Sequence, residues 1–364
     1  MIKTIFPTQD TTIYNTTASM NTGIDEILEL TKVISGSTGA LKRSRALLQF
    51  DFSEISSSLA ARGITTSSDA GNLRYFLKMY IAQEKDVPND YSISIHPLRS
   101  SWVGGLGRST NVPVTEEGCS WTYRDGVTAG TTWADAGGYF ITGAEPLPVA
   151  KSIFSQSYTN IEGDIEVDIT SFVHRTLNGT FENNGLIVKR SGSQETDSSE
   201  YGTLQYFSRE TNTIFPPRIE ARFNSTTDTT RVTGSMATAS ADDLLTVTAL
   251  TFPEYKRDTE TRIELDIQPK FPVRSQGLQA SATTRYSLPT GSTYAICDQA
   301  TGEKIIPHTT TGSLIACNNK HFIDVDMSSL FPERYYTIQI KVPDLLFNGS
   351  EQYFDTDTYF KVVK

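Results

Sequence analysis

Apolar and polar residues alternate with a period of two along much of the chain, and long stretches of helical periodicity are nearly absent. The clearest alternating segments are 72–82, 91–96, 165–169, 263–267 and 336–342. Such alternation is typical of antiparallel strands that place one face on a core and the other in water. Clusters of Ser, Thr, Gly, Asn and Asp between these segments favour turns. The pattern therefore predicts an all-β protein.

Two short helices are expected beside the strands. Segment 171–177 carries its apolar residues on one stripe, a Ser or Thr at its start can cap it, and Gly179 suits a left-handed stop after it. A second helix is expected at 53–62, directly after a strand at 45–52. Neither helix is long enough to change the predicted fold class.

A polar segment divides the chain into two predicted domains. Residues 224–230 contain no large apolar side chain and follow segment 216–223, which has the pattern of a last strand. We therefore place one domain at 1–224 and a second at 225–364. The length of the first suits a jelly-roll sandwich with long loops. The second carries several strands spaced by turn signals, which favours a smaller immunoglobulin-like β-sandwich.

Charge narrows the choice of partners. The 364 residues include 32 Lys and Arg against 42 Asp and Glu, a formal net charge of −10. Nucleic-acid binding requires a basic face, so no nucleic-acid partner is expected. No run of about 18 apolar residues is present, and the first residues lack the apolar stretch of a secretion signal. We expect neither a membrane partner nor export.

The cysteines do not indicate a disulfide framework. Cys119, Cys297 and Cys317 are too few and odd in number. Cys297 and Cys317 could pair across neighbouring strands, but free, partly buried thiols are the expected state. The four histidines lie far apart in the sequence and lack the spacing of zinc ligands.

Acidic side chains raise one further metal hypothesis. Asp10, Asp51, Asp164 and Asp168 could supply oxygen ligands for calcium, yet no contiguous loop of alternating Asp and Asn with a terminal Glu occurs. A solvated acidic face is the simpler interpretation. Neither a metal nor a cofactor is expected.

Catalytic motifs give little support for an enzyme. The chain has no Gly-x-Ser-x-Gly or His-Glu-x-x-His motif, and the Gly-rich segment 104–107 is not followed by the Lys-Ser/Thr of a phosphate loop. Paired carboxylates for glycoside hydrolysis remain open, because they act across space and have no fixed spacing in a sequence. We expect a non-enzymatic protein.

The sharpest functional candidate is an aromatic cluster. All three tryptophans, Trp102, Trp121 and Trp133, fall in one segment together with Tyr123. Their rings could stack on sugars and form a ligand-binding surface. Alternatively, the tryptophans close the open end of a sandwich beneath long loops, and we favour this structural interpretation. Residues 124–126, Arg-Asp-Gly, are expected to form a turn that ties the loop backbone.

Four stretches of the first predicted domain, taken in order, resemble the DNRLRE-type β-jelly-roll module, a relative of some carbohydrate-binding modules. They are the opening strand at 6–14, SRALLQFDF at 44–52, the SW … GCSWTYRDG … TTWADAGGYF loops within 101–140, and the closing VDITSFV and NNGL at 167–173 and 183–186. The resemblance spans residues 6–223. The second predicted domain resembles no family that we can name.

The tryptophan-bearing loops also resemble those of structural proteins of tailed bacteriophages, in which this module occurs without a secretion signal. The resemblance implies a non-enzymatic virion component of the tail, baseplate, neck or fibre attachment. Its partners would be other virion proteins in a multi-copy assembly, and it would reach the virion from the host cytoplasm. The alternative is a carbohydrate-binding adhesin module that recognises cell-surface polysaccharide, and a tail component could also contact a host glycan.

Overall fold

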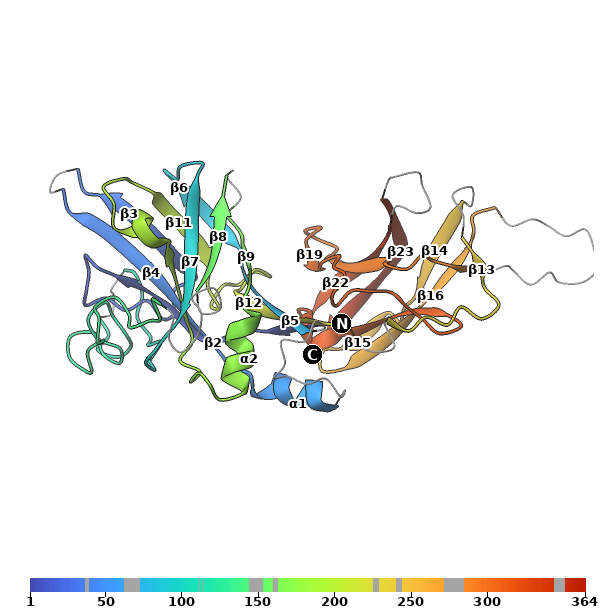
Figure 1. The fold of residues 1–364 in the computed structure, drawn as a ribbon, viewed down its shortest axis with the longest axis horizontal. Helices are drawn as coiled ribbons and strands as arrows, with labels where there is room; N and C mark the ends of the chain where they lie inside the picture. Colours follow the sequence, from blue (N-terminus) through green and yellow to red (C-terminus); the bar gives the residue numbers. More distant parts are fainter. Residues whose placement is uncertain are drawn as a thin grey trace, which may run out of the picture. The chain divides into compact units, whose positions relative to one another are not determined.

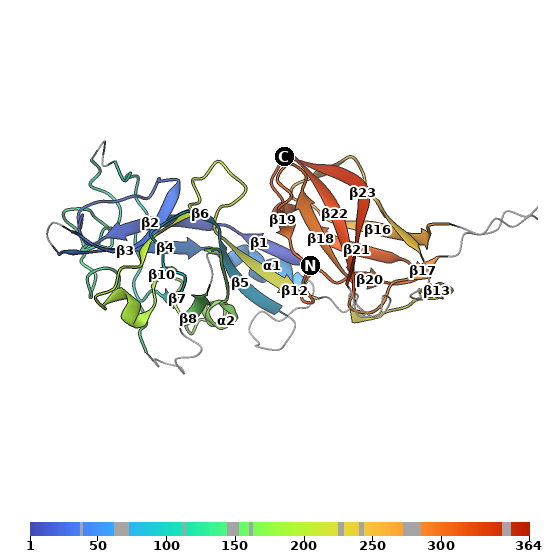
Figure 2. The same ribbon diagram turned by 90° about the horizontal axis from the view of Figure 1, so that it is seen from above.

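The computed structural model describes residues 1–36, 39–61, 73–110, 112, 114–143, 153–159, 163–224, 229–239, 244–271, 285–343 and 351–364. Within these residues the regular elements are strands, apart from two α-helices and two short 3₁₀ turns (Figure 1 and Figure 2). The prediction of an all-β protein built from β-sandwiches is confirmed. No helix in the described part of the chain is both long and apolar enough to cross a membrane.

The chain divides into two compact units. The N-terminal unit comprises Ile5–Asp69 and Tyr75–Glu220, and the C-terminal unit comprises Met1–Thr4, Ala70–Arg74 and Ala221–Lys364. The expected boundary after residue 224 lies close to the limit at Glu220. The first four residues group with the C-terminal unit because the Met1 amino nitrogen donates to the Phe223 carbonyl (2.7 Å) and the Thr4 N–H donates to Ser329 Oγ (2.9 Å).

One large sheet, curled into a half-barrel, forms most of the N-terminal unit. Its strand order is β6 (Ile81–Lys85), β11 (Gly202–Phe207), β3 (Ile27–Ile34), β4 (Leu41–Phe50), β10 (Leu186–Arg190), β7 (Tyr91–Pro97) and β8 (Phe154–Tyr158), with β2 (Pro7–Tyr14) also paired to β4. A second sheet has the order β1 (Ile2–Ile5), β12 (Arg218–Phe223), β5 (Leu73–Met79) and β9 (Ile165–Asp168), and the limits of the two units fall within β1, β5 and β12.

Strand β4 is the centre of the curled sheet. Its first residues pair with β3, and the rest of its length pairs with β2 and β10. Leu47 lies opposite Thr11 on β2 and Ile187 on β10. Because side chains alternate along a strand, Arg45 and Leu47 project from the same face of the sheet. That face carries the aromatic cluster described below.

The two helices lie close to the expected ranges, at α1 (Ser53–Ala61) and α2 (Thr170–Leu177). Gly179 adopts a φ of +77°, the left-handed stop that the sequence indicates. The expected Ser or Thr cap of α2 is not formed, because the N-cap is Ile169 and has no side-chain hydrogen bond. Asp168 instead accepts a hydrogen bond from the Thr170 N–H (2.9 Å), and Thr170 Oγ1 accepts one from the Tyr75 N–H.

The C-terminal unit consists of two sheets and a short ribbon. One sheet has the order β14 (Leu245–Leu250), β16 (Glu260–Pro269), β21 (His321–Asp326) and β20 (Ala316–Cys317). The other has the order β15 (Glu254–Lys256), β23 (Gln352–Val363), β22 (Arg334–Val342), β18 (Thr293–Asp298) and β19 (Lys304–Ile306). The ribbon pairs β13 (Ala237–Thr238) with β17 (Tyr286–Ser287).

This strand order is that of an immunoglobulin-type sandwich. The first sheet reproduces the order A, B, E, D, and β18, β22 and β23 take the places of strands C, F and G. A tyrosine corner supports the assignment, since such corners occur at the start of strand F. Tyr336 donates its hydroxyl to the Phe331 carbonyl (2.9 Å) and accepts from the Phe331 N–H (2.8 Å).

Candidate functional site

The three tryptophans lie in a long irregular segment between β7 and β8, which we call the tryptophan segment (residues 98–141 in its described part). Its ends are held together because the Arg99 N–H donates to the Tyr139 carbonyl (2.8 Å). Within it, Tyr123 and Thr132 form an isolated antiparallel bridge. These main-chain bonds fix the direction of the side chains in a segment without regular strands.

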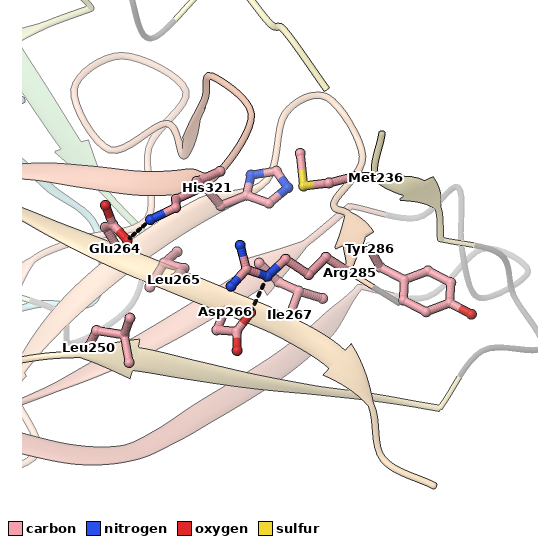
Figure 3. Close-up of a pocket in the computed structure, with 10 residues that line it drawn as sticks. Met236, Leu250, Glu264, Leu265, Asp266, Ile267, Arg285, Tyr286 and His321 are labelled. Atoms are coloured by element: carbon pink, nitrogen blue, oxygen red, sulfur yellow. Dashed lines mark hydrogen bonds and ion pairs between the residues drawn. The ribbon is translucent and has the colours of Figure 1, made fainter. Parts of the chain in front are cut away.

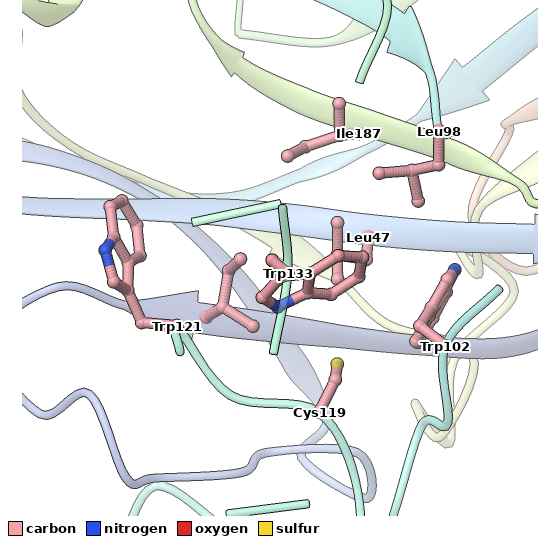
Figure 4. Packing of buried hydrophobic residues seen from close by; sticks show 8 residues of the cluster. Leu47, Leu98, Trp102, Cys119, Trp121, Trp133 and Ile187 are labelled. Atoms are coloured by element: carbon pink, nitrogen blue, oxygen red, sulfur yellow. The ribbon is translucent and has the colours of Figure 1, made fainter. Parts of the chain in front are cut away.

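All three indole rings are buried. The exposed fractions are 5% for Trp102, 8% for Trp121 and 4% for Trp133. The Trp102 N–H donates to the Asn184 carbonyl (3.0 Å), and the Trp133 N–H donates to the Ser120 carbonyl (2.9 Å). Figure 4 shows Trp133 between the other two rings. The cluster also contains Ile13, Leu47, Leu98, Cys119 and Ile187.

Of the four aromatic residues that the sequence suggests as a ligand site, the three tryptophans therefore come together, with their rings toward the interior. Tyr123, the fourth of them, is half-buried and does not belong to the cluster. A sugar ring stacks on an aromatic ring only when the aromatic face is open to solvent. Burial of the indoles favours their structural interpretation as a small core beneath the loops.

A single buried amide, Asn21, holds the glycine-rich part of the tryptophan segment. Its Nδ2 donates to the carbonyls of Gly104 (2.7 Å) and Cys119 (2.8 Å), and its Oδ1 accepts from the Gly107 N–H (2.9 Å). A Cβ added at Gly107 would lie 2.3 Å from the main-chain carbonyl oxygen of Asn21. The glycines at 104–107 thus allow close approach to Asn21.

A buried group of charges supports the Trp121 ring. Glu195 accepts from Arg45 Nε (2.6 Å) and from Lys189 Nζ (2.7 Å). The Arg45 guanidinium also donates to the Gly137 carbonyl (2.6 Å) and lies 4.9 Å from the Trp121 ring centroid. Burial acts to raise the pKa of Glu195, but the two cations outweigh it and lower that pKa below its usual value. Glu195 therefore stays ionised and holds Arg45 against the indole.

The Arg-Asp-Gly turn at 124–126 ties the segment as expected. Arg124 Nη1 donates to the Ser101 carbonyl (3.0 Å), and Asp125 Oδ1 accepts from the Thr131 N–H (2.6 Å). Both side chains are used to bind loop backbone.

The four aspartates considered for calcium lie on separate elements. Each accepts a hydrogen bond from a main-chain N–H: Asp10 from Arg209 (2.7 Å), Asp51 from Ser53 (2.9 Å), Asp164 from Ile81 (2.8 Å) and Asp168 from Thr170 (2.9 Å). Among the described residues, no group of three or more His, Cys, Asp or Glu side chains is placed to hold a metal ion. Asp10 departs from the expected solvated face, because it is buried.

The three cysteines are free thiols. Cys119 and Cys317 are buried, and Cys297 on β18 is half-buried. The pairing of Cys297 with Cys317 that the sequence left open is not present. Cys297 is thus the most accessible thiol of the chain.

A cavity of about 220 Å³ lies beside the tryptophan segment, between the end of β7 and the chain after α2. Arg99, Glu182 and Asn184 provide its polar lining. Asn184 donates weakly to Glu182 (3.4 Å) and its carbonyl accepts from Trp102, so part of this lining is already engaged within the protein.

A smaller pocket of about 50 Å³ lies in the C-terminal unit (Figure 3). Two ion pairs cross it, Lys320 with Glu264 (2.8 Å) and Arg285 with Asp266 (3.5 Å). His321 lines it, and burial lowers the pKa of this imidazole to about 4. The volume accommodates a few water molecules rather than an organic ligand.

The outward side of β22 and β23 carries exposed aromatic rings. Tyr335, Tyr353 and Tyr359 are 48%, 47% and 59% exposed. We call this surface the tyrosine face, and it is formed by Cys297, Tyr335, Thr337, Gln339, Lys341, Tyr353, Asp355 and Tyr359. The alternation of β22 predicts part of this surface. Positions 336, 338, 340 and 342 are apolar and face inward, so the odd-numbered Tyr335 faces outward.

Fold and surfaces define a two-unit, all-β protein whose second unit is an immunoglobulin-type sandwich. The chain matches no protein-family model, and a search of curated proteins finds none that is similar to it.

Proposed function

We propose that the chain is a non-enzymatic structural protein of a tailed bacteriophage virion, a component of the tail, baseplate, neck or fibre attachment that acts through protein–protein interfaces. The resemblance of residues 6–223 to the DNRLRE-type module and to phage structural proteins supports the virion assignment. Its partners would be other virion proteins, present in several copies.

The observation that carries the proposal is a set of exposed apolar side chains around the β14–β16 hairpin. Leu244 precedes β14, Leu250 is its last residue, and Phe252 and Phe271 follow β14 and β16. These side chains are 63%, 57%, 70% and 70% exposed, in that order. Strand β14 is the outermost strand of its sheet. Because Leu245 pairs with Pro269 and Leu250 pairs with Glu264, the four side chains form two pairs at opposite ends of these strands. Large apolar side chains exposed along a sheet edge are typical of surfaces that become buried in an assembly.

Purified particles of the phage that encodes this chain test the proposal. Quantitative mass spectrometry is expected to find the chain at a fixed copy number per particle. A chain that is abundant in the infected lysate but missing from purified particles contradicts the assignment.

A matched pair of variants tests the interface. In a phage complemented in trans, Phe252→Asp is expected to lower incorporation at least tenfold, because a carboxylate resists burial. Tyr359→Ala, which alters an exposed ring on the opposite sheet, serves as the control and is expected to be incorporated normally. Equal incorporation of both variants would exclude the hairpin as the interface.

A further inference from the structure

The tyrosine face differs in composition from the exposed hairpin of the same unit. Its exposed large side chains are tyrosines, separated by Thr, Gln, Lys and Asp, and no exposed Leu, Ile, Val or Phe lies on β22 or β23. Protein interfaces bury an apolar centre, whereas sugars present both C–H faces and hydroxyl groups. Aromatic rings surrounded by hydrogen-bonding groups are therefore suited to binding a sugar.

Tyr353 and Tyr359 lie on the same side of β23, because they are six residues apart and the bulge between them adds an even number of residues. Lys341 lies opposite Tyr353 and Thr337 lies opposite Tyr359, with a register shift between these pairs. At the bulge Asp357 has a φ of 52°, and Thr356 Oγ1 donates to the Ile338 carbonyl (2.9 Å). The extra residues preserve the outward direction of both rings.

The rings form two groups along the strands. Tyr335 and Tyr359 are in edge contact with ring centroids 6.1 Å apart. Tyr353 makes an edge contact with His308 at 5.6 Å. The β22 partners of Tyr353 and Tyr359 are Lys341 and Thr337, so the two groups lie roughly 13 Å apart along the strand direction. This separation suits a chain of several sugar units rather than a single ring.

The polar side chains between the rings are already held in place. Glu351 accepts from Lys341 Nζ (2.7 Å) and from the Tyr353 hydroxyl (3.1 Å). Gln339 donates to Asp355 (2.9 Å). Fixed donors and acceptors reduce the entropy lost when a ligand binds.

Two lysines on this side of the sheet form ion pairs. Lys341 is paired with Glu351, and Lys361, which lies opposite Tyr335, is paired with Glu333. Lys304 lies beside the Tyr353 ring, 5.7 Å from its centroid. The chain as a whole is acidic, with a net charge of −10. A polyanion would therefore be repelled, whereas a neutral ligand would not.

From these observations we infer that the tyrosine face is a binding platform for a neutral polysaccharide, whose sugar rings stack on Tyr353 and on the Tyr335–Tyr359 pair. The site is distinct from the tryptophan segment and does not depend on the chain being a virion component. It adds glycan recognition to a protein whose proposed assembly contacts lie on the other sheet.

Affinity electrophoresis of the full chain in native gels tests this inference. The gels contain galactomannan, xylan, dextran or soluble starch, with alginate as the acidic comparison. At least one neutral polysaccharide is expected to slow the protein. Tyr353→Ala and Tyr359→Ala are each expected to weaken the apparent affinity about tenfold, the loss of one stacked ring. Phe252→Ala, which removes an exposed ring elsewhere, is the matched control and is expected to migrate as the unchanged protein does.

The thiol of Cys297 provides a second measurement on the unchanged protein. Cys297 lies opposite Thr337 on the same face. The retarding polysaccharide is expected to slow its alkylation by a maleimide at least threefold. Absence of retardation in all four neutral gels, equal retardation of the tyrosine variants, or retardation by alginate alone would each overturn the inference. Incorporation into particles is measured in a separate experiment, so a negative result for polysaccharide binding does not contradict the proposed role in the virion.

Discussion

In the N-terminal unit, three indole rings point inward and two of their N–H groups bind main-chain carbonyls, whereas in the C-terminal unit three phenol rings stand on the outside of a regular sheet. The tryptophans form the apolar core of a segment that has no regular strands. The tyrosines occupy outward-facing strand positions, where polar residues alternate with them.

An aromatic cluster in a sequence therefore does not by itself indicate a ligand site. A long irregular segment must bury its own apolar side chains, because only such burial offsets the entropy lost in ordering the loops. Exposed rings on a strand have no such role in stability. Of the two sets, the tyrosines are therefore the better candidates for binding.

The largest effect is expected from truncating the central indole. Trp133→Ala should lower the free energy of unfolding by about 3–5 kcal/mol, because it removes a buried ring and leaves the Ser120 carbonyl without its donor. Urea unfolding followed by circular dichroism measures this change. Tyr359→Ala is the control and should fall within about 0.5 kcal/mol of the unchanged protein. Similar values for both variants would remove the contrast between the two sets.

The next effect concerns the charges behind Trp121. Glu195→Gln should lower the free energy of unfolding by about 3 kcal/mol, since Arg45 and Lys189 then lie buried without a counter-charge. Exposed Glu351→Gln, which also leaves a lysine unpaired, is the matched control, and its effect should be much smaller because water solvates both partners. A near-neutral Glu195→Gln would show that water reaches this group of charges.

A smaller effect, which depends on pH, is expected at Asp10. Burial raises the pKa of this carboxyl from 3.8 to about 7, although the Arg209 N–H opposes the shift. The folded protein therefore keeps the proton at pH values where the unfolded chain has lost it. The resulting stability is present below about pH 4 and is lost as the pH rises to 7.

The Asp10→Asn variant removes this titration. It should exceed the unchanged protein in stability at pH 8 by an amount on the order of 1–3 kcal/mol and match it near pH 4. Urea unfolding at both pH values gives the difference. Burial lowers the pKa of His96 to about 4, but this group titrates in both proteins and cancels. A constant difference across the range would contradict the assignment.

The smallest change tested is in thiol reactivity, without any expected loss of stability. Burial raises the pKa of all three cysteines, but Cys297 alone is half-buried and open to reagent. One maleimide per native chain, located at residue 297 by peptide mass spectrometry, is the expected result. Three should react in urea. Native labelling of Cys119 would indicate that the tryptophan segment opens.

Much of the strand pattern could be predicted from the sequence. Alternation at 336–342 identifies β22 and its buried side, and the polar segment at 224–230 marks the end of β12. Burial of the tryptophans was the favoured expectation, but the direction of each side chain in the loops could not be derived, because irregular segments have no period that separates buried from exposed positions. The order of strands in the sheets likewise depends on contacts between distant residues.

Two features of the molecule could be identified only from the structure, namely the buried charges behind Trp121 and the bulge in β23. Arg45 and Glu195 are 150 positions apart, and neither lies in a motif that indicates pairing. On β23 the alternation continues through the bulge near Asp357, so the sequence pattern indicates the outward side of the strand but not the shift in its pairing with β22. The alternation of β22 and β23 does not distinguish the tyrosine face from an ordinary solvated side of a sheet.

The anchoring of the tryptophan segment through Asn21 has a consequence for engineering. One carboxamide joins two separate stretches of backbone, residues 104–107 and Cys119, and it does so from the buried side, opposite the outer side that faces solvent. Foreign peptides grafted on that outer side could be displayed without disturbing the scaffold, provided that the amide and its glycine neighbours are retained.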